Sequence, residues 1–249
     1  MSKQLLYKLA ITSILWMVAI AYTNAQSLYW VGDGGSWNDA SHWSTTSGGS
    51  GGAGVPATAN AAIFDANSFS SAGQTVTLTT GAICNSINWT GVTNNPTLDL
   101  AANLTISGTS AIFADAMDLS GTATLIFTSA SNTTLTLSNT AKTFGNISFS
   151  SNTARTVNVN FASSNAITQT VGVFTVGNNV TLNLNGPANK VFGGISCGTN
   201  LRLYQLNNAT VNGTANLGAS TSLTISGAGY GVDNVVFNGP MSLTQTLIY

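Results

Sequence analysis

The sequence predicts an all-β fold, and more specifically a right-handed parallel β-helix, also called a β-solenoid. From Gln74 onward, short runs alternate apolar and polar residues, with turn-forming pairs such as Ser-Gly, Asn-Gly and Asn-Asn between them. A six-residue unit with apolar first, fourth and sixth positions also recurs along the chain. No part of the chain after the N-terminal segment has a sustained helical period. An antiparallel β-sandwich array is the alternative fold.

Residues 1–25 are expected to form a secretory signal peptide. Lys3 and Lys8 give this segment a positive start, and the run from Leu9 to Ala21 is apolar and uncharged. The small residues around Ala25 provide a cleavage site, and the apolar run is shorter than the roughly 20 residues of a membrane span. The mature chain is therefore expected to begin at Gln26, to contain no membrane span and to be secreted, either to the cell surface or to the extracellular medium.

Residues 26–73 are expected to form an N-terminal cap rich in tryptophan and glycine. The aromatic residues of the stretch YWVGDGGSWNDASHWS (29–44) include Trp30, Trp37, His42 and Trp43. Large aromatic side chains held by glycine turns can cover the apolar end of a first coil with few residues. The alternative is a platform on which these rings stack against sugars while Asp33 and Asp39 bind hydroxyl groups.

The same stretch offers few ligands for a metal ion. His42 is the only histidine of the chain, which excludes a paired-histidine site. Asp33 and Asp39 lack a third acidic or amide ligand at the spacing of a known calcium loop. We therefore predict no metal site and no cofactor, and calcium is an alternative that requires ligands from neighbouring loops.

Residues 74–249 are expected to form the solenoid. The alternating runs are TVTLTT (75–80), TLDL (97–100), NLTISG (103–108), TLTLS (134–138), TVNVNF (156–161), VTLNLNG (180–186) and SLTISG (222–227). Each run places an apolar residue at every second position, which is the period of a strand with one buried face. A coil of about 20–25 residues cannot bury this face alone, so we expect stacked coils to share one core.

Four copies of the six-residue unit define the expected core: CNSINW (84–89), FGNISF (144–149), FGGISC (192–197) and VDNVVF (232–237). The expected core residues are Cys84, Ile87, Trp89, Phe144, Ile147, Phe149, Phe192, Ile195, Cys197, Val232, Val235 and Phe237. The intervals between the copies are unequal, and each suits two or three intervening coils. Because Cys84 and Cys197 occupy positions that Phe and Trp fill in other copies, we expect them to be core side chains rather than a disulfide.

Charge is scarce in this chain. The acidic residues are 7 Asp, and the basic residues after the signal segment are Lys142, Arg155, Lys190 and Arg202. Nucleic acids and anionic membranes require clustered Lys and Arg, so neither is predicted as a partner. Ser, Thr, Asn and Gly must supply the polar surface, and glycans or extracellular matrix are the expected partners.

Asp115 and Asp118, in FADAMDLSG (113–121), form the other close acidic pair. Paired carboxylates act as acid and base in polysaccharide-cleaving enzymes, so a lyase or hydrolase of β-helix type is an alternative function. However, the odd separation puts the two side chains on opposite faces of a regular strand, and no glutamate or neighbouring cation accompanies them. No catalytic residue is therefore predicted.

The Thr-rich strands suggest a third class, the ice-binding solenoids. That function requires Thr at one position on many successive coils. Here Thr alternates with Asn, Ser and Asp, and Thr is also favoured on any half-exposed strand face. Ice binding is therefore the less favoured alternative.

The segment from Tyr29 to Gly91, about a quarter of the chain, carries motifs of a known kind: YWVGDGGSWNDASHWSTTSGGSGG, VPATANAAIFDANSFS, QTVTL and CNSINWTG. This segment resembles the N-terminal region of large secreted surface proteins of the Bacteroidota, many of which carry a type IX secretion sorting domain at the far C-terminus. A looser form of the pattern is similar to the start of autotransporter-type β-helix passengers. The resemblance implies an adhesin-like or matrix role.

Two features depart from the pattern of that family. The family often has an acidic residue where this chain has Asn60, which argues against a cation contact there. The final run, MSLTQTLIY (241–249), is apolar and has no capping turn or sorting domain. A bare solenoid end exposes an unpaired strand edge, so we expect the chain to be the front part of a longer protein.

Overall fold

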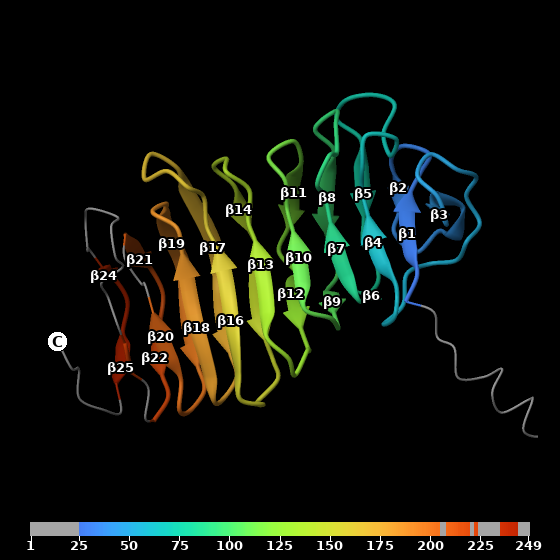
Figure 1. The fold of residues 1–249 in the computed structure, drawn as a ribbon. Helices are drawn as coiled ribbons and strands as arrows, with labels where there is room; N and C mark the ends of the chain where they lie inside the picture. The colour runs from blue at the N-terminus through green and yellow to red at the C-terminus, as the bar shows by residue number, and fades with distance from the viewer. Residues whose placement is uncertain (1–24, 205–207, 220–221, 224–234, 244–249) are drawn as a thin grey trace, which may run out of the picture.

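The computed structural model describes residues 25–204, 208–219, 222–223 and 235–243. Over these residues the chain is a parallel β-solenoid built of three sheets, A, B and C, as predicted (Figure 1). Its one described helix is a short 3-10 turn, η1 (Ala40–His42). The segment expected to be a signal peptide lies outside the described residues, except for Ala25, and so does the expected core residue Val232.

Sheet A forms the near side of the solenoid in Figure 1. Its strands, in spatial order, are β23 (Ser222–Leu223), β20 (Arg202–Tyr204), β18 (Val180–Asn185), β16 (Arg155–Asn160), β13 (Thr133–Thr136), β10 (Ser110–Ile112), β7 (Ser86–Asn88), β4 (Ala61–Ile63), β1 (Ser27–Trp30) and β3 (Trp43–Ser44). Among the described strands, only β1 and β3 pair antiparallel. This pairing pattern decides against the antiparallel sandwich.

Sheets B and C complete each coil. Sheet B consists of β11 (Asp118–Gly121), β8 (Thr97–Leu100), β5 (Thr75–Thr77) and β2 (Gly35–Ser36). Sheet C consists of β24 (Val235–Phe237), β21 (Ala209–Val211), β19 (Asn189–Cys197), β17 (Thr168–Val176), β15 (Asn146–Phe149), β12 (Thr124–Phe127), β9 (Leu104–Ile106), β6 (Ala82–Cys84), β14 (Thr143–Phe144), β22 (Ala215–Leu217) and β25 (Met241–Leu243). After β11, segments without strand structure (137–142, 161–167 and 186–188) take the place of sheet B.

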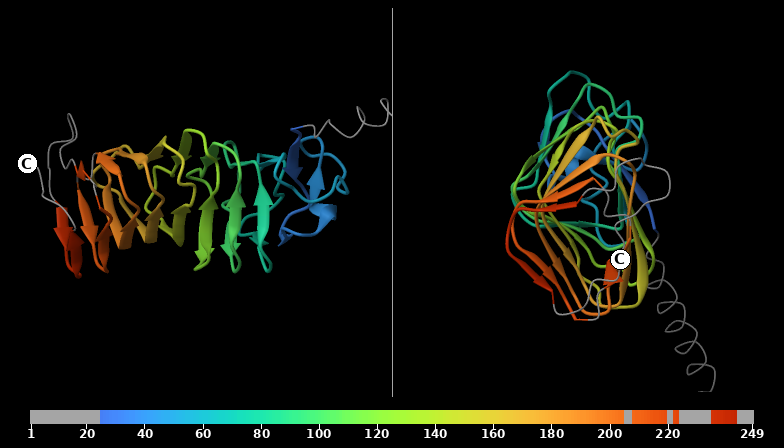
Figure 2. Two further views of the ribbon diagram at one scale, coloured as in Figure 1. Left: turned by 90° about the horizontal axis from the view of Figure 1, so that it is seen from below. Right: turned by 90° about the vertical axis from the view of Figure 1, so that its left-hand side faces the viewer.

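The coils differ in length by a few residues. Asn183 and Asn158, which are paired in adjacent strands of sheet A, are separated by 25 residues in the sequence, and the corresponding amides of Asn200 and Asn179 are separated by 21 residues. Seven such steps lead from β4 to β23 along sheet A. In Figure 1 the chain rises along sheet A, crosses the top and descends along sheet C while it advances from right to left, so the solenoid is right-handed. Figure 2 shows the coils superposed when they are viewed along the stack.

Inward side chains of successive coils form one continuous core. In sheet A one inward row is 2% exposed or less throughout and consists of Leu28, Ala62, Ile87, Ala111, Leu135, Val159 and Leu184. Burying one large aliphatic side chain of this kind contributes about 1.5–3 kcal/mol. The first step, from Leu28 to Ala62, is longer because it accommodates the segment that folds over the N-terminal end. The described residues contain no helix that is long and apolar enough to cross a membrane.

The six-residue units fall in three different registers, so the sequence alignment of all four is wrong for the first and the fourth. Phe144 and Phe192 occupy one inward row of sheet C, and Phe149 and Cys197 occupy another, so the second and third units are equivalent. The first unit differs, because Cys84 belongs to the row of Phe149 and the chain then turns into sheet A at Ile87 and Trp89. In the fourth unit, Phe237 belongs to the row of Phe192. The described core residues are buried, except for Val235 and Phe237, which are half-buried.

Candidate functional site

The three tryptophans of the N-terminal segment lie inside the cap. Trp30, Trp37 and Trp43 have no exposed surface. The ring centroid of Trp43 lies 5.1 Å from that of Trp30 and 4.9 Å from that of Trp37. All three pack around Phe64, which stacks on Trp89 of the next coil. Because a buried ring cannot stack on a sugar, these side chains form the hydrophobic centre of the cap and not a ligand platform.

His42 completes the aromatic stack from its outer side. Its ring lies parallel to that of Trp30, with centroids 4.6 Å apart. Its Nδ1 lies 2.9 Å from the carbonyl oxygen of Val31, and since a carbonyl can only accept, Nδ1 carries the hydrogen. A Cβ at Gly35 would collide with Nε2 of this ring, so residue 35 must be a glycine for the ring to stack here.

Asp33 and Asp39 each stabilise a turn of the cap. The Asp33 carboxylate accepts hydrogen bonds from the backbone N–H and the hydroxyl of Ser70, at 2.6 and 2.8 Å. The Asp39 carboxylate accepts from the N–H and hydroxyl of Ser41, at 2.9 and 2.7 Å, at the start of η1. These hydrogen bonds lower the pKa of both carboxyl groups. Among the described residues, no group of His, Cys and Asp side chains is arranged to hold a metal ion.

Asp115 and Asp118 contact the next coil at separate points. The Asp115 carboxylate accepts a hydrogen bond from the backbone N–H of Asn139 at 2.5 Å. The Asp118 carboxylate forms an ion pair with Lys142, with N and O 3.0 Å apart. Each partner is 24 residues further along the chain, which is one coil. In this arrangement the two carboxylates link neighbouring coils.

The two cysteines lie in one inward row of sheet C. The row runs from Cys84 to Cys197 through Ile106, Phe127, Phe149 and Val176. These five steps place the cysteines about 24 Å apart, since neighbouring strands are about 4.8 Å apart, whereas a disulfide needs Cα atoms within about 7 Å. Both thiols are buried and unpaired.

We expect both thiols to be unreactive in the folded protein. Burial raises the pKa of Cys84 and of Cys197 to about 12, and the thiolate is the reactive form. A thiol-specific reagent such as Ellman's reagent should therefore label neither cysteine at pH 8 in buffer and both cysteines in denaturant. Rapid labelling of one thiol in buffer would contradict the buried position in the core.

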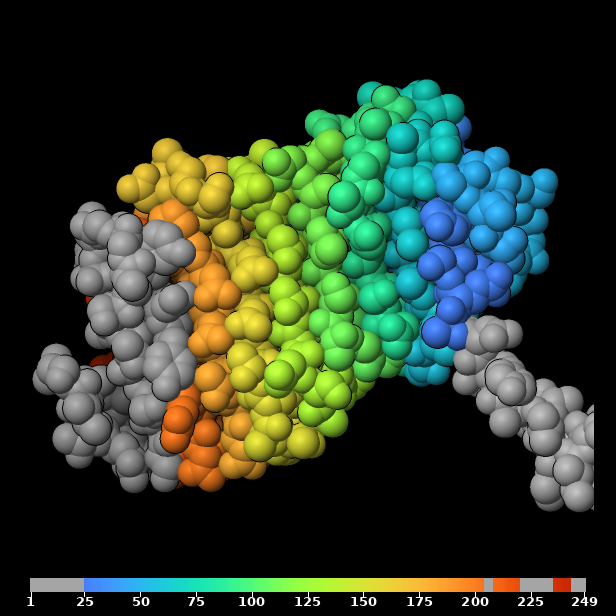
Figure 3. Space-filling view, in the orientation of Figure 1, coloured from blue at the N-terminus to red at the C-terminus, as the bar shows by residue number. Residues whose placement is uncertain are grey.

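The outer face of sheet A carries two rows that consist mostly of uncharged amides and hydroxyls, with Ile112 as an apolar member of the second. One row consists of Ser110, Thr134, Asn158 and Asn183, and a second consists of Asn88, Ile112, Thr136, Asn160 and Asn185. The amide of Asn183 donates to Oδ1 of Asn158 at 2.8 Å, and that of Asn185 to Oδ1 of Asn160 at 2.9 Å. These bonds fix the amides and leave each with further donor and acceptor capacity toward solvent. Figure 3 shows this face as a continuous surface of adjacent coils.

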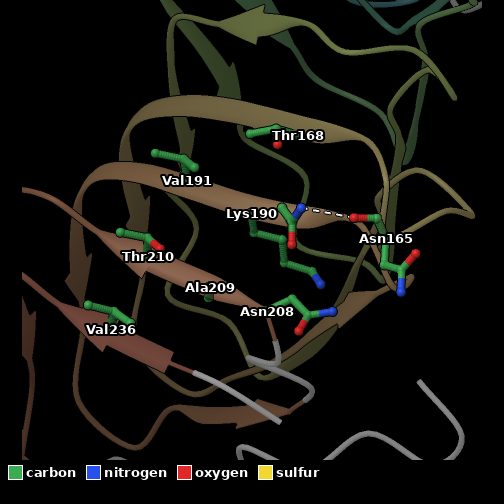
Figure 4. A pocket seen from close by; sticks show the side chains of 9 residues that line it. Asn165, Thr168, Lys190, Val191, Asn208, Ala209, Thr210 and Val236 are labelled. Atoms are coloured by element: carbon green, nitrogen blue, oxygen red, sulfur yellow. Dashed lines mark hydrogen bonds between the residues drawn. The ribbon is translucent and has the colours of Figure 1, made fainter. Parts of the chain in front are cut away.

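The outer face of sheet C is hollowed in two places. One cavity, of about 350 Å³, is lined by Asn165, Thr168, Asn189, Lys190, Val191, Asn208, Ala209, Thr210 and Val236 (Figure 4). The other, of about 320 Å³, is lined by Gly121, Thr122, Thr143, Phe144, Gly145, Asn146, Thr170, Val171, Gly172, Val191, Gly193 and Asn212. Val191 of β19 lines both cavities. Ligand pockets in proteins usually have volumes of about 300–1,000 Å³.

Two polar side chains, Gln169 and Lys190, lie inside sheet C as neighbours in one inward row. Gln169 donates to the carbonyl of Ser138 at 2.7 Å and accepts from the N–H of Ala162 at 2.8 Å. Lys190 donates to the carbonyl of Gly186 at 2.7 Å. The backbone groups that they bind belong to the segments that replace sheet B. In a coil with sheet B, such backbone groups would be hydrogen-bonded to a neighbouring strand, and here the side chains of Gln169 and Lys190 bind them instead.

The polar outward surface of Ser, Thr and Asn was expected from the sequence, but neither the individual rows nor the cavities were. One signal was available, because Asn recurs at matching positions of TVNVNF (156–161) and VTLNLNG (180–186), one coil apart. The cavity-lining residues give no such signal, since they become neighbours only through the register of sheet C.

In comparisons with known proteins, no protein-family model matches the chain, and no curated protein or solved structure is significantly similar to it.

Proposed function

We propose that this chain is a secreted or cell-surface β-solenoid module with an adhesin-like function, which binds glycans or extracellular matrix. The observation that carries the proposal is the outward surface of uncharged amides and hydroxyls, repeated from coil to coil and fixed by hydrogen bonds such as Asn183 to Asn158. The signal-like N-terminal segment and the resemblance to secreted surface proteins support export.

Such a surface suits ligands that repeat. A single hydrogen bond to an uncharged ligand contributes only about 0.5–1.5 kcal/mol, so affinity requires many contacts made together. Amides that are already held in one conformation, such as Asn160 and Asn185, lose little further entropy when a ligand binds. A polysaccharide offers repeated hydroxyl groups at a spacing that a rigid stack of coils can meet many times.

We expect the purified protein to bind uncharged polysaccharides with an affinity that depends little on salt. Charged contacts are screened within about 10 Å at 0.1 M ionic strength, whereas hydrogen bonds between neutral groups are not. A glycan array, followed by affinity measurements between roughly 0.05 and 0.5 M NaCl, tests this and should show less than about a twofold change in Kd. Binding confined to anionic glycans and lost as salt rises, or no binding to any glycan or matrix protein, would contradict the proposal.

A further inference from the structure

The two cavities on sheet C belong to one groove that follows the solenoid axis. A single row of outward side chains passes through both, each paired with the next, and consists of Thr143, Thr170, Val191, Thr210 and Val236. Five strands about 4.8 Å apart give this row a length of about 19 Å. Figure 4 shows Val191, Thr210 and Val236 on three successive strands, pointing to the same side. The groove is therefore elongated across the coils rather than along one strand.

Glycine lines the part of the groove that the second cavity forms. Gly145, Gly172 and Gly193 line it on three successive coils. A Cβ at Gly145 would lie 2.7 Å from the carbonyl oxygen of Ala123, and one at Gly193 would lie 3.2 Å from the backbone of Gly172. Side chains are thus excluded here because the backbones of successive coils approach closely. As a consequence, no side chain from these positions covers the groove.

The chemistry of the groove is neutral and mixed. Hydroxyl groups come from Thr143, Thr170 and Thr210, and amides come from residues such as Asn189 and Asn212. Apolar contact surface comes from Val191, Val236 and the glycine backbone. The one charged residue in the lining, Lys190, has no exposed surface, because its side chain lies in the interior and donates to the carbonyl of Gly186.

This combination matches one class of ligand. A sugar ring presents hydroxyl groups at its edges, which bind amides and hydroxyls, and C–H groups on its faces, which pack on aliphatic side chains. The lack of exposed charge in the lining offers no compensation for a charged ligand, whose desolvation would be costly. A linear chain of sugars also matches a groove that repeats similar contacts from coil to coil.

We propose that the groove between Thr143 and Val236 on sheet C is the glycan-binding site and that its ligand is a linear, uncharged polysaccharide lying along the solenoid axis. This inference rests on the proposed glycan-binding function and assigns its site and ligand class. The flat face of sheet A has similar chemical groups, but its residues line neither cavity.

The test fills the groove at its centre. Val191→Phe places a larger side chain where the two cavities meet, on an outward, half-buried position of β19. Val173→Phe is the matched control, since Val173 is an outward residue of the neighbouring strand β17, 45% exposed, and lines neither cavity. Asn183→Phe adds similar bulk to the face of sheet A. Neutral glucan, mannan and xylan oligosaccharides of increasing length are titrated by calorimetry against the full chain and the three variants.

The expected result is a Kd that falls with oligosaccharide length and then levels off, and a loss of at least tenfold in affinity for Val191→Phe. The control Val173→Phe should change the affinity less than twofold. Asn183→Phe measures what the amide surface of sheet A contributes, and its loss should be smaller than that of Val191→Phe. Unchanged melting temperatures establish that the variants fold. If Val191→Phe binds like the wild type, the assignment of the groove is overturned although glycan binding stands, and a loss in Asn183→Phe would then place the site on sheet A. If the wild type binds no oligosaccharide or polysaccharide, the proposed function fails as well.

Discussion

Replacing Trp43 by alanine is expected to destabilise the N-terminal cap by about 3–5 kcal/mol, the usual cost of truncating a buried tryptophan. Trp43 has no exposed surface, and its ring packs against Trp30, Trp37 and Phe64. Its Nε1 also donates a hydrogen bond of 2.8 Å to the carbonyl of Trp37. The substitution therefore leaves both a cavity and a buried carbonyl without its partner.

Urea unfolding measures this effect when it is followed both by tryptophan fluorescence, which reports the N-terminal end because no tryptophan follows Trp89, and by far-UV circular dichroism, which reports all coils. Because each coil interacts mainly with its neighbours, we expect the loss to appear first at the N-terminal end, as an early transition that precedes unfolding of the later coils. Trp43→Phe is the control, since it retains an aromatic ring and should cost only about 1–3 kcal/mol for the unpaired carbonyl. If Trp43→Ala shifted the unfolding free energy by less than about 1 kcal/mol, the side chain would not be a central part of the cap.

The solenoid fold followed from local patterns because each strand has one buried face. Alternation in TVNVNF (156–161) and VTLNLNG (180–186) corresponds directly to β16 and β18, whose apolar residues point inward and whose Thr and Asn residues point outward. The three tryptophans of the glycine-rich stretch 29–44 are close in sequence, and in the structure they are buried against one another. These features depend on residues that are close in sequence.

The register between coils was less predictable. The sequence pattern aligned Cys84 with Phe144, whereas the structure places Cys84 in the row of Phe149. The reason is that coil lengths vary, as the different sequence separations of Asn158 from Asn183 and of Asn179 from Asn200 show, so a fixed spacing does not determine the row. The groove on sheet C could not be predicted for the same reason. Its residues become neighbours only through the way the strands of successive coils pair.

The alternation of apolar and polar residues also did not predict that Lys190 lies in the interior. From the sequence, Lys190 is one of four basic residues after the signal segment and has no predicted position, whereas in the structure it occupies an inward position of β19 and has no exposed surface. A lysine is acceptable there because β11 is the last strand of sheet B among the described residues, and the amine donates to corner carbonyls, those of Gly186 and Ala188, that pair with no described strand. Whether a coil has a strand in sheet B depends on the packing of the whole coil, and no short run of sequence predicts it.

The stability of the protein is expected to rise between pH 8 and pH 10.5 through Lys190. Burial lowers the pKa of its amine from 10.5 to about 8 in the folded state. Between these two values the unfolded chain holds a proton at this residue that the folded chain has released, so unfolding becomes less favourable as the pH rises. Below pH 8 both states are protonated, and the folded state bears the full cost of the buried charge. The gain across the window is at most about 3 kcal/mol.

The difference between the wild type and Lys190→Met isolates this effect from the titration of tyrosines and other groups. At pH 7 the methionine removes the buried charge but leaves the carbonyls of Gly186 and Ala188 without the amine, so the two changes partly offset each other. At pH 10 only the loss of hydrogen bonds remains, and the variant should be clearly less stable than the wild type. Urea unfolding at half-unit pH steps measures both curves. If the two curves stayed parallel from pH 8 to pH 10.5, the amine of Lys190 would have an ordinary pKa, and its place in the interior of sheet C would be wrong.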